Sequence, residues 1–317
     1  MLVQESEFEQ RTRDKLRRDL GPIISAAMAD PLTVEIMLNP DGTLWQERLG
    51  EPMREIGSLA PHWAEAVINT LASHLDREVS RVSPMVEGEL PPDGARFAGQ
   101  VPPIVSAPTF SIRVPAVRSL SLGQYVMQGV MTQEQRVILE EAVAARENIL
   151  VVGGTGSGKT TLVNALIAAI VDSAPNDRLV LIEDTREIQC SAQNFVQYRV
   201  APTVGMTELL RTTLRMRPDR ILVGEVRGPE ALDLLMAWNT GHAGGIATVH
   251  ANDAVSGLLR LEMLVSMHRH APARPAPLIA EAVDIIVHIE RTPKGRRVKQ
   301  LCRVLGGEGG VYQTCTL

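Results

Sequence analysis

The spacing of apolar residues changes several times in the first third of the chain, which predicts a mixed helix and strand domain. Alternating strands and a second helix follow an opening helix, and a turn-rich stretch at 84–96 is expected to be irregular. The opening helix has one apolar side, formed by Leu16, Leu20, Ile23, Ile24 and Ala27. The predicted elements are a helix at 7–28, strands at 33–38 and 43–47, a helix at 63–75 and a strand at 110–114.

Beyond residue 131, short apolar runs alternate with helical patterns, which is typical of a parallel sheet with helices on both faces. A capping box from Thr132 to Gln135 predicts where its first helix begins. We therefore predict a smaller α+β N-terminal domain at 1–120, a linker at 121–131 and an α/β domain at 132–317. The predicted elements are strands at 148–152, 178–182, 220–223 and 245–249, helices at 161–167, 207–217, 229–238 and 255–263, an exposed loop at 268–277, and a hairpin of 283–289 with 297–304.

A glycine-rich stretch between the first of these strands and its helix fits G-x-x-x-x-G-K-[ST], the phosphate-binding P-loop. Its glycines let successive backbone N–H groups face one anion, and the following helix adds its positive end. Lys159 can reach the β- and γ-phosphates, and the Thr160 hydroxyl can hold Mg²⁺. We therefore expect ATP and Mg²⁺ as ligands. The predicted nucleotide contacts are Gly153, Gly154, Thr155, Gly156, Ser157, Gly158, Lys159, Thr160 and Thr161.

Two carboxylates stand at the ends of predicted strands, Glu183 and Glu225. The carboxyl ends of parallel strands meet at one edge of a sheet, so both are expected on the P-loop side. Hydrolysis of a phosphoanhydride needs a placed water, Mg²⁺ and a nearby carboxylate. Glu225 could hold the metal through water, orient the attacking water, or do both. The alternative is that each acid caps a helix or forms an ion pair.

Two histidines, His242 and His250, flank a glycine-rich strand entry. Their eight-residue spacing across a loop matches no recognised metal-ligand pattern. A phosphate-sensing role is one reading, and a packed or hydrogen-bonded structural residue is the other.

Composition narrows the class of protein. The chain has 317 residues, enough for two domains, and its net charge of −5 argues against whole-surface binding to nucleic acid. Three widely spaced cysteines suggest neither a disulfide framework nor a zinc site. No apolar run reaches the roughly 18 residues that span a bilayer. We expect a cytoplasmic protein, with any contact to the inner-membrane surface peripheral.

The order of these motifs resembles the secretion traffic ATPases. The P-loop is followed by Ile182 to Glu187, Leu222 to Arg227 and Thr240 to His250, which match that family's Asp box, Walker B and His box. The stretch from Glu35 to Gly42 is similar to the type IV secretion branch.

The resemblance implies a homo-hexamer of two-domain subunits with a RecA-like P-loop NTPase domain, working with other proteins of a secretion or conjugation apparatus. It implies that Glu183 and Glu225 serve hydrolysis and that His242 and His250 sense phosphate or couple domains. It also implies that first-domain arginines reach the γ-phosphate, and Arg96 and Arg113 match best. The type II relatives carry a four-cysteine zinc module, which Cys302 and Cys315 alone cannot form.

Two other functions stay open. A nucleic-acid translocating motor, such as a helicase or DNA-packaging ATPase, would need basic pore loops and aromatic stacking positions, and the chain is acidic with few aromatics. A nucleotide-binding scaffold without turnover is less consistent with Glu225 at a strand end. Direct nucleic-acid binding is therefore left undecided.

Overall fold

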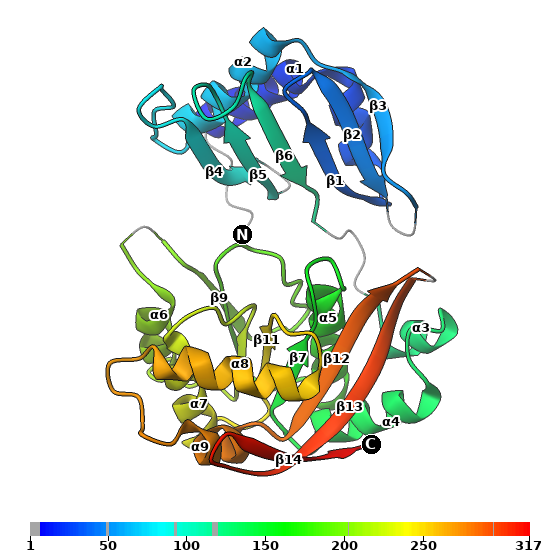
Figure 1. Ribbon diagram of the computed structural model, residues 1–317, viewed down its shortest axis with the longest axis vertical. Coiled ribbons are helices and arrows are strands. Elements are labelled where there is room, and N and C mark those ends of the chain that lie inside the picture. Colours follow the sequence, from blue (N-terminus) through cyan, green and yellow to red (C-terminus); the bar gives the residue numbers. More distant parts are fainter. Residues whose placement is uncertain (1–6, 49–50, 92–93, 116–119, 202, 294) are drawn as a thin grey trace. The chain divides into compact units, whose positions relative to one another are not determined.

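The computed structural model describes residues 7–48, 51–91, 94–115, 120–201, 203–293 and 295–317. The chain divides into two compact units, Met1–Val117 and Arg118–Leu317 (Figure 1). No helix among the described residues is long and apolar enough to cross a bilayer.

The first unit is a six-stranded antiparallel sheet with two helices on one face (Figure 1). Its strand order is β3-β2-β1-β6-β5-β4. Alternate strand residues such as Ile36, Phe97 and Ile112 pack against Ile24 and Leu71 of the helices, so the residues between them point to the other face of the sheet. The elements are α1 (Glu7–Ala29), β1 (Thr33–Leu38), β2 (Thr43–Arg48), β3 (Arg54–Ser58), α2 (Pro61–His74), β4 (Met85–Leu90), β5 (Ala95–Gln100) and β6 (Thr109–Arg113).

Four of the five predicted elements of this unit are confirmed within two residues, and the opening helix is confirmed with a kink. The kink lies at Gly21, whose φ of 71° and ψ of 178° precede Pro22. The prediction of irregular structure at 84–96 is wrong for the strand residues of that range, because β4 pairs with β5 there, and residues 92–93 lie outside the described residues. Glycines and prolines hid the alternation of buried residues that β5 shows at Ala95, Phe97 and Gly99.

The second unit is an α/β domain built on an eight-stranded sheet, ordered β14-β13-β12-β7-β11-β10-β8-β9 (Figure 1). The six strands from β12 to β9 are parallel, and β13 and β14 extend the sheet antiparallel. The strands are β7 (Ile149–Val152), β8 (Leu179–Glu183), β9 (Phe195–Arg199), β10 (Arg220–Val223), β11 (Ile246–Val249), β12 (Ile285–Thr292), β13 (Gly295–Glu308) and β14 (Val311–Thr316).

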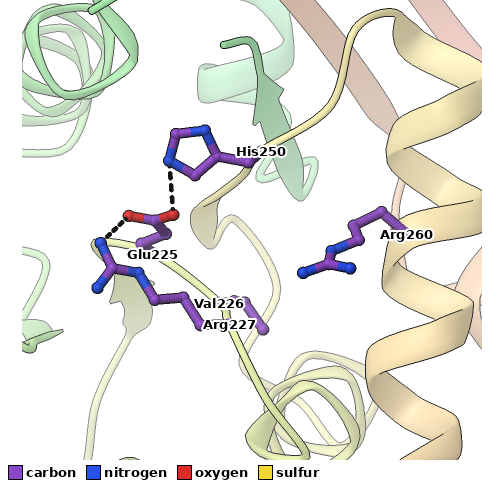
Figure 2. A pocket seen from close by; sticks show the side chains of 5 residues that line it. All are labelled: Glu225, Val226, Arg227, His250 and Arg260. Carbon is purple, nitrogen blue, oxygen red and sulfur yellow. Dashed lines mark hydrogen bonds and ion pairs between the residues drawn. The ribbon is translucent and has the colours of Figure 1, made fainter. Parts of the chain in front are cut away.

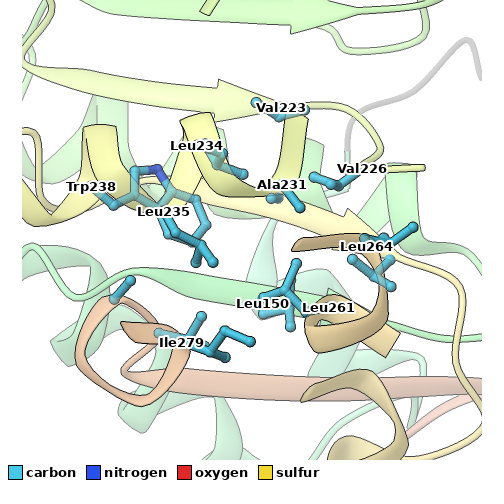
Figure 3. Packing of buried hydrophobic residues seen from close by; sticks show 14 of the residues in the cluster. Leu150, Val223, Val226, Ala231, Leu234, Leu235, Trp238, Leu261, Leu264 and Ile279 are labelled. Carbon is cyan, nitrogen blue, oxygen red and sulfur yellow. The ribbon is translucent and has the colours of Figure 1, made fainter. Parts of the chain in front are cut away.

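Helices cover both faces of this sheet, so its central strands are buried on both sides. Leu150 and Val223 pack against the helical residues Leu235, Trp238 and Leu261 (Figure 3). One face carries α3 (Leu122–Met127), α4 (Gln133–Ala144) and α5 (Lys159–Ser173); the other carries α6 (Met206–Thr213), α7 (Glu230–Asn239), α8 (Ala254–Ser266) and α9 (Pro275–Ala282).

The capping box at Thr132 is confirmed, with Gln135 N donating to Thr132 Oγ1 at 3.2 Å. Three other expectations are corrected. The segment predicted as a linker, 121–131, contains α3, whose buried Leu122 and Tyr125 join the core of the second unit. The helix predicted at 207–217 ends at Thr213, and the loop predicted at 268–277 already includes the start of α9, where Pro275 is buried. Strands β9 and β14 were not predicted.

Candidate functional site

The P-loop follows β7 at the carboxyl edge of the parallel sheet. Gly153 is required there because a Cβ would lie 2.3 Å from the Ile289 carbonyl oxygen and 2.5 Å from Ser157 Oγ. Gly156 and Gly158 have φ of 69° and 99°, in the left-handed region that glycine adopts without strain. Gly158 is also the N-cap of α5 and has no capping side chain, which leaves that helix end available to an anion.

Lys159 is buried, and its ammonium bonds the P-loop itself. Its Nζ donates to the carbonyl oxygens of Gly153 and Gly154, both at 3.0 Å, and lies 3.2 Å from Nδ1 of His250. The flexible side chain can exchange these carbonyls for a phosphate, which is a stronger, charged acceptor.

The hydroxyl of Thr160 is held by a carboxylate that sequence analysis did not single out. Thr160 Oγ1 donates to Glu187 Oε2 at 3.0 Å. A hydroxyl beside a carboxylate at the start of a P-loop helix supplies the oxygen ligands that Mg²⁺ prefers, and the remaining positions would be waters and phosphate oxygens. Thr160 and Glu187 therefore fit a magnesium ion.

The carboxylate of Glu183 is buried and fully engaged with its own loop. Its Oε1 accepts from the backbone N–H groups of Glu187 at 2.9 Å and Ile188 at 2.8 Å, and its Oε2 accepts from Gln197 Nε2 at 2.6 Å. Burial raises the pKa of Glu183, against the lowering effect of these hydrogen bonds. Glu183 thus shapes the loop that carries Glu187 rather than presenting a free carboxylate to water.

Replacing Glu183 with glutamine should flatten the pH dependence of stability. A carboxyl whose pKa is raised by folding holds its proton more tightly in the folded chain, so its ionisation destabilises the fold as pH rises. As pH rises from about 4.3, the usual pKa of glutamate, to the raised pKa of Glu183, the unfolding free energy of Glu183→Gln should therefore increase relative to that of wild type. Denaturant unfolding at several pH values measures this difference. Glu281→Gln, at an exposed glutamate of α9, is the matched control, and an equal trend in both variants would contradict the assignment.

Glu225 lies at the centre of a chain of charged contacts (Figure 2). Its Oε1 is 2.9 Å from Nε2 of His250, and its Oε2 accepts from Arg227 Nη2 at 2.6 Å. Arg227 Nη1 is in turn 3.5 Å from Asp184 Oδ2. Because the same imidazole contacts Lys159, the P-loop ammonium and the Glu225 carboxylate are joined through one ring. This carboxylate is more accessible than that of Glu183, and it borders a pocket of about 340 Å³.

The structure therefore brings Lys159, Thr160, Glu183, Glu225 and His250 to one edge of the sheet, because each follows or ends a parallel strand or begins the helix after it. It does not bring His242 there. His242 precedes β11, whereas His250 follows it, and Nδ1 of His242 lies 3.1 Å from the Pro218 carbonyl oxygen at the opposite edge. Within this chain, His242 is therefore not placed to sense phosphate at the P-loop, and its other implied role, the coupling of domains, stays a prediction.

Four further residues of the site were not singled out by sequence analysis: Asp184, Glu187, Arg227 and Arg296. The first three lie inside the stretches that match the Asp box and Walker B of the family, and that position could have marked them as site residues. Arg296 comes from β13 and donates from Nε to the Gly156 carbonyl oxygen at 3.4 Å. No local pattern links a residue 140 positions away to the P-loop.

Arg96 and Arg113 are direct cross-strand partners on β5 and β6 of the first unit. They alternate with the buried Phe97 and Ile112, so both lie on the sheet face that the helices leave uncovered. Two like charges placed opposite each other are unfavourable. The register sets Glu89 beside Arg96 and Glu35 beside Arg113, which offsets part of that repulsion.

Comparison with known proteins gives a consistent family. The family model described as "Type II/IV secretion system protein" matches residues 18–306. The chain is 50% identical over 299 residues to the probable conjugal transfer protein TrbB of Sinorhizobium fredii, covering 94% of this chain and 91% of that protein. It is 50% identical over 300 residues to the conjugal transfer protein TrbB of Rhizobium radiobacter, covering 95% and 92%.

Among solved structures, the Legionella pneumophila ATPase DotB is similar in fold, with a TM-score of 0.63, 20% sequence identity and coverage of 87% of this chain and 77% of that one. The family match extends over both units and includes every box described above. The chain therefore belongs to the type II/IV secretion system protein family, among the traffic ATPases of type IV secretion and conjugal transfer.

Proposed function

We propose that this protein is a Mg²⁺-dependent ATP hydrolase that works as a homo-hexameric ring and powers the assembly of, or transfer through, a type IV secretion or conjugation apparatus. The observation that carries the proposal is the continuous contact from Lys159 through His250 to Glu225. It joins the phosphate-binding ammonium to the best-placed candidate for the general base. The same proposal includes a RecA-like fold for the second unit and a peripheral location of the protein at the inner membrane.

In this proposal, ATP binding rearranges groups that already touch. Lys159 leaves the Gly153 and Gly154 carbonyls for the β- and γ-phosphates, and its contact with His250 changes with it. His250 then passes that change to Glu225, which orients the attacking water. Bound Mg²⁺ would neutralise phosphate charge, held by Thr160 and Glu187. Nucleotide sensing and the general base are thus coupled through one imidazole.

The first unit would supply positive charge to the γ-phosphate. Arg96 and Arg113 are neighbours on an uncovered sheet face, where two guanidinium groups could clamp one phosphate. Their mutual repulsion would be relieved when an anion lies between them. The nucleotide would then depend on both units, which links hydrolysis to their relative motion.

One preparation of the full chain tests the proposed function. ATP hydrolysis is measured with and without single-stranded DNA, and the mass of the particle is measured in solution. Hydrolysis by a six-subunit particle, with no stimulation by DNA, is the expected result. Strong stimulation by DNA would favour a nucleic-acid motor, and ATP binding without turnover would favour a scaffold.

Arg113→Ala should lower the rate of hydrolysis about tenfold or more while changing ATP affinity less. The loss should fall short of a whole arginine finger, which is worth about 10³-fold or more, because the adjacent Arg96 keeps one positive charge in place. Turnover and nucleotide binding are measured side by side. Arg77→Ala, at an exposed arginine of the same unit, is the control. A fragment lacking residues 1–120 that retained full activity would rule out any catalytic group in the first unit.

A further inference from the structure

A pocket borders Glu225. It has a volume of about 340 Å³ and is lined by Glu225, Val226, Arg227, His250 and Arg260 (Figure 2). No residue of the P-loop, all of which the structure describes, is among its lining residues. His250 contacts Lys159 as well as Glu225, so the His250–Glu225 pair both lines this pocket and touches the P-loop lysine.

Arg260 is the charged lining residue of this pocket that the site described above does not include. It lies on α8 and points toward the pocket from the side across from Glu225 and Arg227 (Figure 2). It is exposed, and its guanidinium contacts Met263 Sδ at 3.5 Å on its own helix. Over the described ranges, no carboxylate lies within ion-pair distance of it. Sulfur is a weak acceptor, so most of the five donors of this guanidinium remain available.

The charge of the pocket favours an oxyanion. Among the lining residues there are two guanidinium groups and one carboxylate, which is already bonded to Arg227 and His250. Arg227 also pairs with Asp184, so Arg260 is the group that brings positive charge to the pocket. Arginine pairs bind phosphate through several parallel, charge-assisted hydrogen bonds. The volume of the pocket exceeds what a single phosphate needs, so the anion would enter with part of its water.

We propose that Arg260 and Arg227 form an exit site for the inorganic phosphate that hydrolysis releases. This inference rests on the proposed function. When the His250–Glu225 contact opens, phosphate leaves the P-loop side, enters the pocket and is held by Arg260 before it reaches solvent. Return of the contact then separates the product from the loop, so a new ATP can bind without competition from the departing phosphate.

Phosphate binding to the full chain tests the site. The protein is saturated with ADP and Mg²⁺ to occupy the P-loop, and inorganic phosphate is titrated by calorimetry at fixed ionic strength. Arg260→Gln should weaken this binding about tenfold, the scale expected for one charged hydrogen bond. The matched control is Arg269→Gln, an exposed arginine beyond the end of α8, which should leave it unchanged. Phosphate also inhibits hydrolysis as a product, and its inhibition constant should rise by the same factor in Arg260→Gln.

The outcomes separate the two proposals. Equal phosphate binding in wild type and Arg260→Gln, or equal weakening in both variants, overturns the exit site. Unchanged phosphate binding with loss of the oligomer in Arg260→Gln also overturns it, since Arg260 would then pair with a carboxylate of a second copy of this chain. ADP binding without any hydrolysis by wild type contradicts the proposed function, whereas the titration with phosphate still reports on the pocket.

Discussion

Lys159→Ala is expected to abolish ATP hydrolysis while leaving the fold intact. The loop takes its shape from Gly153, Gly156 and Gly158, which the substitution does not touch. The substitution removes the buried ammonium together with its contacts to two carbonyls and an imidazole, so it leaves no unpaired charge in the interior and should cost little stability. Phosphate release and circular dichroism are measured on the same sample.

The control for this substitution is Lys299→Ala. Lys299 is exposed and forms a surface ion pair with Glu290, which is worth little. The Lys299→Ala variant should therefore keep both the fold and the activity. Normal turnover in Lys159→Ala would remove the basis for the P-loop assignment, and loss of the circular dichroism signal would mean that Lys159 is a structural residue.

Glu225→Gln should bind ATP and hydrolyse it on the order of 10² to 10⁴ times more slowly. The amide keeps the size of the side chain and can still accept a hydrogen bond from Arg227, but it cannot take a proton from water. Stopped-flow binding of a fluorescent ATP analogue and steady-state phosphate release separate the two steps.

The same measurements on Glu281→Gln, at an exposed glutamate of α9, show whether loss of one negative charge is enough to change the rate. It should not be. If ATP binding falls together with hydrolysis in Glu225→Gln, then Glu225 holds the metal or the fold, and its role as general base must be abandoned.

The contrast between Glu183 and Glu225 shows where sequence reasoning reached its limit. Both end or follow parallel strands, and their local patterns are alike. Only the packing of β9 beside β8 brings Gln197 to Glu183, and only the chain reversal after β8 aims two backbone N–H groups at it. Burial and partners of a carboxylate depend on segments that its own neighbours in sequence do not encode.

The histidines show the same limit. His242 and His250 flank one strand, so the sequence alone treats them alike. A strand of four residues, β11, separates them and carries them to opposite edges of the sheet.

The need for glycine at position 245 is likewise not visible in the sequence around it. A Cβ there would lie 2.0 Å from Trp238 Nε1, on a helix that precedes this strand.

By itself, the sequence determined the alternation of strands and helices in the second unit, the capping box at Thr132 and the glycine loop before Lys159. These features depend on φ, ψ and side-chain spacing within about a dozen residues, which a local pattern can specify. The tertiary structure alone decided that His250 joins Lys159 to Glu225, that Glu183 is enclosed, that Arg96 lies beside Arg113, and that Arg260 borders the pocket at Glu225. Apart from the backbone bonds from the loop after β8 to Glu183, these are contacts between residues far apart in the chain, and such contacts form only when whole elements pack.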